Sequence, residues 1–318
     1  MTRILFITSN RLGDAVLSTG ILAHLLAAYP GARTRVVCGP VAAGLFAGVP
    51  GLERVIELPK RKHSLHWWTM WWACIGVFWD VVVDLRNAPL SYALAAKRQI
   101  HLGKANKKFG HRVEALGSLL GRAQNPPAPT LWTTPEAEAA ANAMIPPGAP
   151  VLMVGPSANW IGKIWDPQRF VDLAFRLTGP RGILPGARIA VLAHRSEQHL
   201  ARPVLDALPA DRRLDLIGET PLATVAAVLR RAAFYVGNDS GLMHMAAAAG
   251  VPTLGLFGPS REQHYGPWGP VAAAVRGDKK YDDVFPDDYD YRNTPSLMGD
   301  LSVDQAARAA KDLWSRVA

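Results

Sequence analysis

The chain has 318 residues, of which 49% are hydrophobic and 19% are charged, and its formal net charge at pH 7 is +9. This length suits two domains that each bury a core, and the hydrophobic content excludes a mainly disordered chain. The two cysteines, Cys38 and Cys74, stand far apart in the sequence, with neither metal-like spacing nor a disulfide framework. We therefore expect a reducing compartment and no structural zinc.

The first apolar run, residues 3–8, ends at a polar turn. It is too short for the hydrophobic region of a signal peptide and has no small-residue cleavage site. A second apolar stretch, residues 65–79, contains five tryptophans, but it is shorter than the roughly 20 residues that span a membrane. We expect a cytoplasmic protein. The tryptophans either face a membrane interface or pack on the first domain's sheet, and we favour packing.

Short apolar runs alternate with helical patterns, which predicts parallel sheets with helices between their strands. In the first half we predict strands at residues 3–8, 35–39, 54–58 and 80–85, and helices at 15–29, 89–98 and 134–144. In the second half we predict strands at 151–155, 188–193, 214–217, 234–237 and 253–257, and helices at 167–177, 197–208, 222–231, 241–249 and 302–317.

Two proline-rich runs, residues 126–129 and 146–150, punctuate the chain, and the second is the predicted domain boundary. The sequence thus predicts an N-terminal Rossmann-like domain over residues 1–147, a C-terminal Rossmann-like domain over 148–300 and a closing helix over 301–318. Both domains are expected to be doubly wound α/β structures with parallel sheets.

Three turns follow predicted strands and carry the candidate chemistry. Ligands of doubly wound sheets bind beyond the carboxyl ends of the strands, so we expect the turns after Thr8, Gly155 and Gly237 to face a shared cleft. The most informative turn lies in residues 236–244, where a strand ends just before a helix begins. Backbone N–H groups at a helix start bind phosphate without a cation. The first turn has neither G-x-G-x-x-G nor a Walker A sequence, which disfavours dinucleotide oxidoreductases and P-loop enzymes.

The excess positive charge lies in the first half. Up to Pro150 there are 16 Lys plus Arg against 8 Asp plus Glu, whereas the remainder has 19 against 18. Residues 60–62, 97–98 and 104–112 supply most of it. A basic face favours phosphorylated lipid, nucleic acid or a membrane surface, although a single cluster is more often only a solvated surface. We expect no nucleic-acid partner, because no reading motif is recognisable.

Three motifs, in this order, resemble the family 9 glycosyltransferases, the lipopolysaccharide heptosyltransferases. They are Asn10-Arg-Leu-Gly-Asp-Ala15, Lys163-Ile-Trp-Asp-Pro-Gln-Arg-Phe170, and Gly237-Asn-Asp-Ser-Gly-Leu-Met-His244 followed by Leu256-Phe-Gly-Pro-Ser260. The resemblance implies a GT-B fold, in which two Rossmann-like domains face a central cleft. It also implies inverting, metal-independent and cofactor-free transfer of a sugar, commonly from ADP-heptose, to a lipopolysaccharide core or related surface glycan. The chain departs from the family where Asp166 separates Trp165 from Pro167, which leaves the reaction class better supported than the donor.

Asp14 is the candidate catalytic residue. An acceptor hydroxyl that attacks an anomeric carbon must lose its proton, and a carboxylate after the first strand is suited to accept it. The alternative is that Asp14 caps a helix that starts at Ala15. The resemblance places the family's catalytic Asp at this position and favours the general base.

The donor-binding candidates are Lys163, Asp239, Ser240, Gly241 and His244. Ser240 and Gly241 offer backbone N–H groups to the leaving diphosphate, and the resemblance assigns the charge of Lys163 to the same phosphates. Without the motif, Lys163 would read as an exposed loop lysine. Asp239 is expected to accept hydrogen bonds from sugar hydroxyls or from backbone amides. His244 either touches the donor or packs in the core.

Weaker acceptor-binding candidates are Asn10, Arg11, Lys104, Lys107 and Lys108, which would meet an anionic glycolipid. Asp288-Tyr-Asp290 has the D-x-D pattern of metal-dependent sugar transferases. We reject it as a metal site because it lies in an acidic, irregular stretch and not at a strand end.

Two other functions remain as alternatives. A GT-B-like nucleotide-sugar epimerase would need acid and base groups on the sugar ring, and no such set is visible. A nonenzymatic module could hold a nucleotide sugar or a glycolipid, but the presence of Asp14, Lys163 and Asp239 argues against degeneration. We expect a cytoplasmic enzyme that can be peripheral on the inner membrane. The sequence identifies neither the base-reading residues nor the acceptor.

Overall fold

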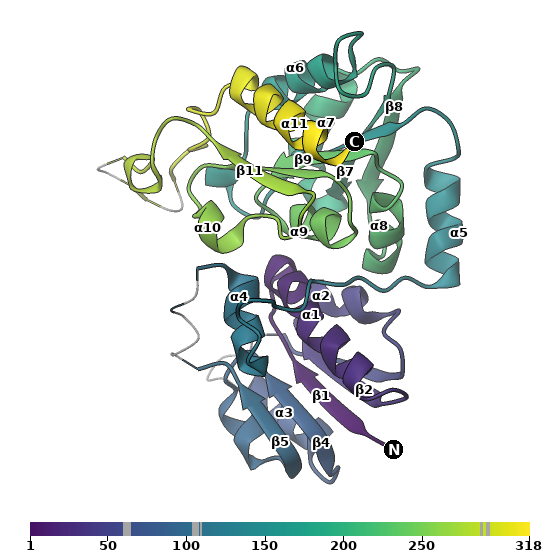
Figure 1. The fold of residues 1–318 in the computed structure, drawn as a ribbon, viewed down its shortest axis with the longest axis vertical. Helices are drawn as coiled ribbons and strands as arrows, with labels where there is room; N and C mark the ends of the chain where they lie inside the picture. Colours follow the sequence, from purple (N-terminus) through teal and green to yellow (C-terminus); the bar gives the residue numbers. More distant parts are fainter. Residues whose placement is uncertain (60–64, 104–107, 109, 287–288, 291–292) are drawn as a thin grey trace. The chain divides into compact units, whose positions relative to one another are not determined.

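The computed structural model describes residues 1–59, 65–103, 108, 110–286, 289–290 and 293–318. The chain folds as two compact units, Met1–Pro135 and Glu136–Ala318. Each unit contains one parallel sheet with helices on its faces (Figure 1). The predicted pair of doubly wound α/β domains is confirmed.

The sheet of the first unit has the strand order β3-β2-β1-β4-β5, and all neighbouring strands are parallel. Along the chain its elements are β1 (Arg3–Ile7), α1 (Leu12–Ala28), β2 (Arg33–Cys38), α2 (Pro40–Ala43), η1 (Gly44–Phe46), β3 (Leu52–Glu57), α3 (His66–Cys74), β4 (Trp79–Asp84), η3 (Pro89–Ala93), β5 (Ala96–His101), α4 (Arg112–Gly117) and η5 (Ser118–Leu120). Strands β1 and β4 are central and nearly fully buried, as expected of apolar runs that are covered on both faces.

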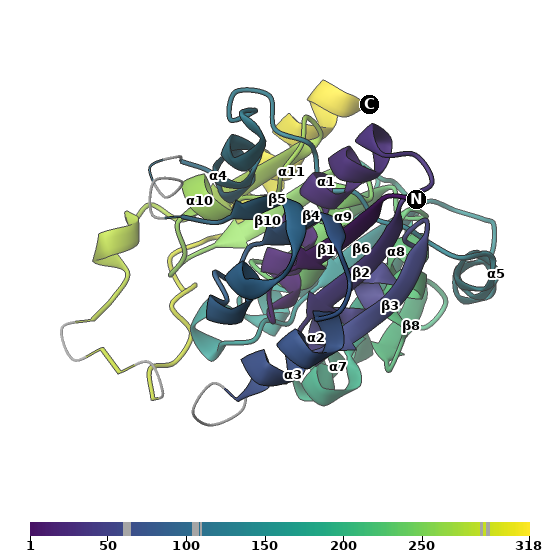
Figure 2. The same ribbon diagram turned by 90° about the horizontal axis from the view of Figure 1, so that it is seen from below.

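Helices cover both faces of this sheet. Figure 2 shows α1 and α4 on one side of the strands and α3 on the other. Leu5, Ile7 and Val82 pack against Met70 and Cys74 of α3 in one buried cluster. We expected the tryptophan-rich helix to pack on the sheet, and one face of α3 does so.

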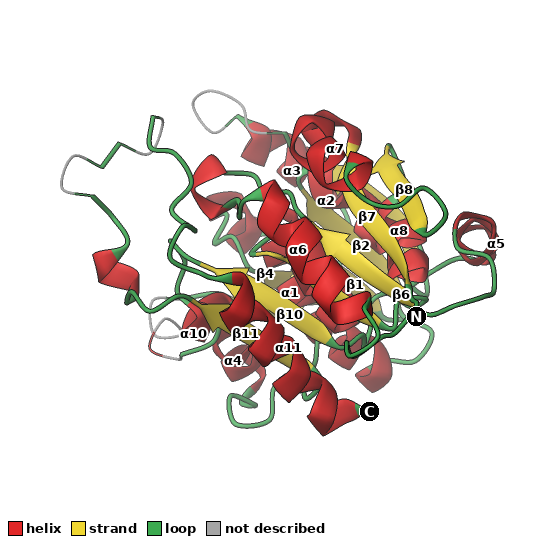
Figure 3. Ribbon diagram, turned by 90° about the horizontal axis from the view of Figure 1, so that it is seen from above, coloured by secondary structure: helices red, strands yellow, loops and turns green. Residues whose placement is uncertain are grey.

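The sheet of the second unit has the order β11-β10-β9-β6-β7-β8, again parallel throughout. Its elements are α5 (Pro135–Met144), β6 (Val151–Gly155), η6 (Ile161–Lys163), α6 (Pro167–Thr178), β7 (Arg188–His194), η7 (Arg195–Glu197), α7 (Gln198–Asp206), β8 (Arg213–Gly218), α8 (Leu222–Leu229), β9 (Phe234–Asn238), α9 (Gly241–Ala248), β10 (Thr253–Phe257), α10 (Glu262–Tyr265), β11 (Ala272–Arg276), η8 (Tyr281–Asp283) and α11 (Val303–Val317). Helices α6 and α11 cross in front of the strands in Figure 3, and α8 and α9 lie on the opposite face in Figure 1.

The sequence prediction was wrong at one helix, and it missed the strands β5 and β11 and the short helices α2, α4 and α10. Residues 89–98 do not form a helix, because they divide into η3 and the start of β5. Both missed strands, β5 and β11, lie at sheet edges, where only part of each strand is buried. Strand β5 carries Lys97, Arg98 and Gln99, and β11 consists mainly of alanine, so neither has the run of branched apolar residues that is typical of strands.

Helix α5 belongs to the second unit. Its Glu138 forms ion pairs of 3.3 Å with both Arg230 and Arg231 at the end of α8. The compact units thus divide at Pro135/Glu136, and the functional limits 1–147, 148–300 and 301–318 stay a prediction. Among the described residues, no helix has the length and apolar character needed to cross a membrane.

Candidate active site

The candidate residues follow the strands at which the strand order of each sheet reverses. In the first unit this switch point lies between β1 and β4, and in the second unit between β6 and β9. The carboxyl ends of strands at such points are where ligands of doubly wound sheets bind. The turn that contains Asp14 follows β1, and those that contain Lys163 and Asp239 follow β6 and β9.

The turn after β1 is held by its own chain. The hydroxyls of Thr8 and Ser18 are 2.7 Å apart and join the end of β1 to the first turns of α1. Across the turn, a Cβ on Gly39 would lie 2.6 Å from the Cα of Asn10, so this close approach requires glycine. These contacts fix the backbone that presents Asn10 and Asp14.

Asp14 is not a helix cap. Helix α1 begins at Leu12, and its N-cap is Arg11, whose side chain makes no capping hydrogen bond. Asp14 instead lies in the first helical turn, where the helix dipole favours a carboxylate. It is half-buried and forms no hydrogen bond or ion pair with any residue that the structure describes. The capping alternative is therefore wrong, and the carboxylate is available to a ligand.

The acceptor candidates are only partly placed by the structure. Asn10 is half-buried, and its buried Oδ1 has no hydrogen-bond partner within the described ranges, while Arg11 and Lys108 are exposed. Lys104 and Lys107 lie outside the described residues. Their predicted role stays a prediction.

Sequence reasoning missed Arg86, which follows β4 at the same edge of the first sheet. Its guanidinium carbon lies 4.4 Å from the ring centroid of Trp67, and its buried Nη1 has no hydrogen-bond partner among the described residues. Burial lowers the pKa of Arg86, and the charge of Asp84 opposes this shift. Asp84 is itself fully buried and accepts hydrogen bonds from Ala88 N (2.6 Å) and Ser91 Oγ (2.7 Å). An isolated arginine has no sequence motif that would have found this position.

In the second unit, the side chain of Asn238 connects the ends of β6 and β9 to the lysine motif. Asn238 is fully buried at the end of β9. Its Nδ2 donates to the carbonyl of Pro156 (2.8 Å), and its Oδ1 accepts from the backbone N of Trp165 (3.1 Å). The single amide thus ties two separate parts of the loop after β6 to the end of β9.

The lysine motif is also held from its other side. The fully buried Trp165 donates through Nε1 to the carbonyl of Leu301 (2.9 Å) and packs its ring edge-on to Phe170 at 5.1 Å. The backbone N of Leu297 donates to the carbonyl of Gly162 (3.0 Å). The backbone on both sides of Lys163 is therefore fixed before any ligand binds.

The structure brings Lys163, Asp239 and His244 together. Lys163 Nζ donates to Asp239 Oδ2 at 2.5 Å, with side-chain exposures of 23% and 7%. His244 is buried, and its Nε2 lies 3.9 Å from Asp239 Oδ1. Asp239 thus holds the ammonium group of Lys163 in place, a role that the sequence reasoning did not assign to it.

Ser240 and Gly241 form the start of α9. Ser240 is the N-cap but makes no side-chain capping bond, and the first helical N–H groups have no intrahelical acceptors. The buried hydroxyls of Ser240 and Tyr235 have no hydrogen-bond partner among the described residues. A Cβ on Gly155 or Gly237 would lie 2.0 or 2.5 Å from the Tyr235 hydroxyl, so both strand ends need glycine. Burial raises the pKa of Tyr235, which keeps the hydroxyl protonated.

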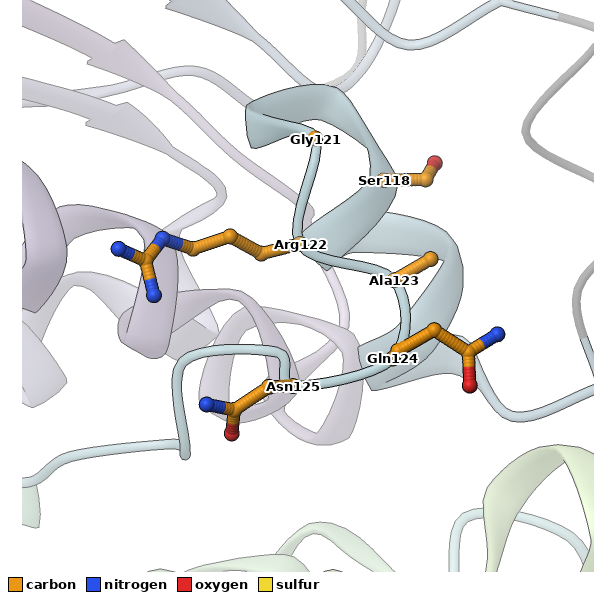
Figure 4. A pocket seen from close by; sticks show the side chains of 6 residues that line it. All are labelled: Ser118, Gly121, Arg122, Ala123, Gln124 and Asn125. Atoms are coloured by element: carbon orange, nitrogen blue, oxygen red, sulfur yellow. The ribbon is translucent and has the colours of Figure 1, made fainter.

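Two further features of the described residues lie outside this candidate site. The described residues contain no group of three or more His, Cys, Asp or Glu side chains that could hold a metal ion. Asp288 lies outside the described ranges, and Asp290 Oδ2 accepts from Asn293 Nδ2 at 2.5 Å. A hollow of about 370 Å³ lies at the end of α4 (Figure 4), and its lining, Ser118, Gly121, Arg122, Ala123, Gln124 and Asn125, includes no candidate site residue.

The sequence is similar to those of known heptosyltransferases. The model of the family described as "Glycosyltransferase family 9 (heptosyltransferase)" matches residues 87–285. Lipooligosaccharide heptosyltransferase 2 of Haemophilus influenzae is 24% identical and covers 86% of this chain and 88% of its own. Lipopolysaccharide heptosyltransferase 1 of Pseudomonas aeruginosa is 26% identical, with 84% and 81% covered.

Solved structures show the same fold. The Escherichia coli ADP-heptose lps heptosyltransferase II has a TM-score of 0.74 at 18% identity and covers 99% of each chain. The E. coli heptosyltransferase WaaC with ADP has a TM-score of 0.70 at 17% identity and covers 98% of this chain and 100% of its own. The predicted GT-B fold is confirmed.

Replacing Asn238 with leucine should destabilise the second unit. The substitution keeps the approximate volume but leaves Trp165 N–H and the Pro156 carbonyl buried without partners. At about 1–3 kcal/mol for each of the two buried groups, the loss should be about 2–6 kcal/mol of unfolding free energy, measured by denaturant titration. Asn159→Leu, an exposed position in the same loop, should change this value by less than about 0.5 kcal/mol. Equal unfolding midpoints for both variants would show that the Asn238 contacts contribute nothing.

Proposed function

This chain belongs to glycosyltransferase family 9, and on that basis we propose that it transfers heptose from ADP-heptose to a lipopolysaccharide core, with inversion and without a metal ion. The observation that carries the proposal is the ion pair between Lys163 and Asp239. It lies at the β6–β9 switch point, just before the start of α9. The second unit would bind the donor and the first unit the acceptor. The names of the relatives support both substrates, since they include lipopolysaccharide heptosyltransferases and an ADP-heptose enzyme.

The leaving group in this reaction is ADP, whose diphosphate gains negative charge as the anomeric bond breaks. Lys163 supplies a full positive charge, and the N–H groups at the start of α9 supply aligned partial charges. Because Asp239 and Asn238 hold these groups in place, little reorganisation is needed when the charge develops. Fixed donors and one cation thus take the part that a divalent ion has in metal-dependent transferases.

Inversion requires a single displacement. The acceptor oxygen forms a bond to the anomeric carbon on the face opposite the diphosphate, the bond to the diphosphate breaks, and the acceptor proton passes to the carboxylate of Asp14. Asp14 suits this role because its carboxylate forms no hydrogen bond or ion pair with a described residue. Asn10, Arg11 and Lys108 would contact the acceptor.

The acceptor in the proposed reaction is a lipid-linked glycan, so the reaction takes place at a membrane surface. The excess of positive charge in the first unit supports an anionic acceptor, because Met1–Pro135 has 16 Lys plus Arg against 6 Asp plus Glu. The cytoplasmic face of the inner membrane stays a prediction.

Asp14→Asn should abolish transfer while leaving donor binding intact. The amide keeps the size of the side chain but cannot accept the proton, so turnover should fall about 100-fold or more. The measurement is the rate of ADP release with saturating donor and acceptor, beside ADP affinity by calorimetry. Glu57→Gln, at the exposed carboxyl end of β3, is the matched control and should keep near-normal turnover. If Asp14→Asn turns over like wild type and melts at the same temperature, another residue is the base.

ADP should stabilise the protein equally with and without a chelator. At 100 times its dissociation constant, the nucleotide should add about 2.7 kcal/mol to the unfolding free energy. Thermal unfolding in EDTA should show the same rise in melting temperature as in buffer alone, because Lys163 and the start of α9 need no ion. A stabilisation that disappears in EDTA and returns with manganese would refute metal independence.

A further inference from the structure

Helix α3 divides its tryptophans between two environments. Trp67 and Trp71 pack partly against the core of the first unit. Trp68 and Trp72, four residues apart and hence on one helix face, are 52% and 70% exposed. Packing on the sheet therefore accounts for only half of the tryptophans in this helix.

The exposed face continues beyond the two tryptophans. Leu65 and Ile75 extend it at the two helix ends, and Phe78 follows after the turn, with exposures of 53%, 41% and 56%. We call these five residues the Trp68–Trp72 face. They are five of the eleven large apolar side chains that the described residues expose, so exposure is concentrated here. The sequence from Ser64 to Trp79 contains no Lys, Arg, Asp or Glu, whereas a helix that faces only water carries polar residues on its outer side.

The aromatic rings of this face are ordered by contacts with one another. Trp68 and Trp72 each pack edge-on against Trp71, with ring centroids 6.0 and 5.3 Å apart. Trp71 in turn contacts the core. Contacts with Trp71 thus hold the two exposed rings in place. A partner that covers them therefore costs little side-chain conformational entropy.

The first unit also carries positive charge near the end of α3. Arg54 is exposed and forms no ion pair with the described residues. Burial raises the pKa of the Cys74 thiol at the end of α3, and the charges of Arg35 and Arg54 oppose this shift. In the sequence, Lys60-Arg61-Lys62 stands shortly before α3, outside the described residues. The first unit has a formal net charge of +10, from 16 Lys plus Arg against 6 Asp plus Glu, whereas the second has −1, from 19 against 20.

We propose that the Trp68–Trp72 face seats the first unit on an anionic lipid surface, with its indole rings at the level of the headgroups. Tryptophans together with nearby arginines and lysines form the combination that membrane interfaces favour. A short helix that lies in the interface buries one apolar face without spanning the bilayer. This inference goes beyond the proposed reaction, because transfer to a lipid-linked acceptor does not by itself require the protein to contact the lipid surface.

The test is sedimentation of the full chain with vesicles, compared with a double variant that makes the face polar. Wild type should bind vesicles of phosphatidylglycerol and phosphatidylcholine, and more weakly in high salt. Trp68→Gln/Trp72→Gln should bind roughly tenfold or more weakly. Arg54→Gln should weaken binding about fivefold, the effect of one basic residue near an anionic surface. Phe175→Gln/Tyr265→Gln removes two exposed aromatic rings from the second unit and should bind like wild type.

Three results would overturn the proposal. They are no binding to anionic vesicles, equal binding by wild type and the tryptophan variant, and dimerisation without lipid that this variant abolishes. The third result would identify a second copy of the chain as the occupant. Transfer to an acceptor freed of its lipid chains should be unchanged in the tryptophan variant. Absence of that transfer in wild type would contradict the proposed reaction and leave the vesicle result standing.

Discussion

The hydrogen bonds of the Asn238 side chain are the constraint on which the second unit's candidate site depends. A parallel sheet brings strand ends to one edge, but Lys163 lies eight residues beyond β6, in a loop that the sheet alone does not position. Asn238 holds this loop at Pro156 and at Trp165, and it directly precedes Asp239. One buried amide therefore fixes the loop in which Lys163 lies beside its carboxylate partner, Asp239.

The two units meet opposite electrostatic requirements. In the proposed reaction the donor diphosphate needs a cation that stays in place, and in the second unit Asp239 holds the ammonium group of Lys163. A general base needs a carboxylate that no cation occupies, and Asp14 has no partner within the described residues. The first unit carries most of the positive charge, yet Asp14 lies at a helix start, where backbone dipoles favour its charge without neutralising it.

The sequence predicted what depends on local pattern. Strands such as β6 and β10 were found at their observed limits, because residues buried on both faces form continuous apolar runs. Strand β5 was missed because it carries Lys97, Arg98 and Gln99, and β11 because alanine has a low strand propensity. The alternative that Asp14 is a helix cap is wrong because α1 begins at Leu12, three residues earlier than expected. The bond from Trp165 to Leu301 joins residues 136 positions apart, and no local pattern reveals such a contact. The motifs indicated that Lys163 and Asp239 serve one ligand, but not that they pair with each other.

The most direct measurement is the affinity of the full chain for ADP and for adenosine, by calorimetry, in wild type and in Lys163→Met. If Lys163 holds the diphosphate, the variant should bind ADP about 10- to 100-fold more weakly, the loss of a charge-assisted hydrogen bond, and adenosine within about twofold of wild type. Lys311→Met, an exposed lysine of α11, should bind both ligands like wild type. An unchanged affinity of Lys163→Met for ADP, or an equal loss for ADP and adenosine, would contradict a diphosphate site at the β6–β9 switch point.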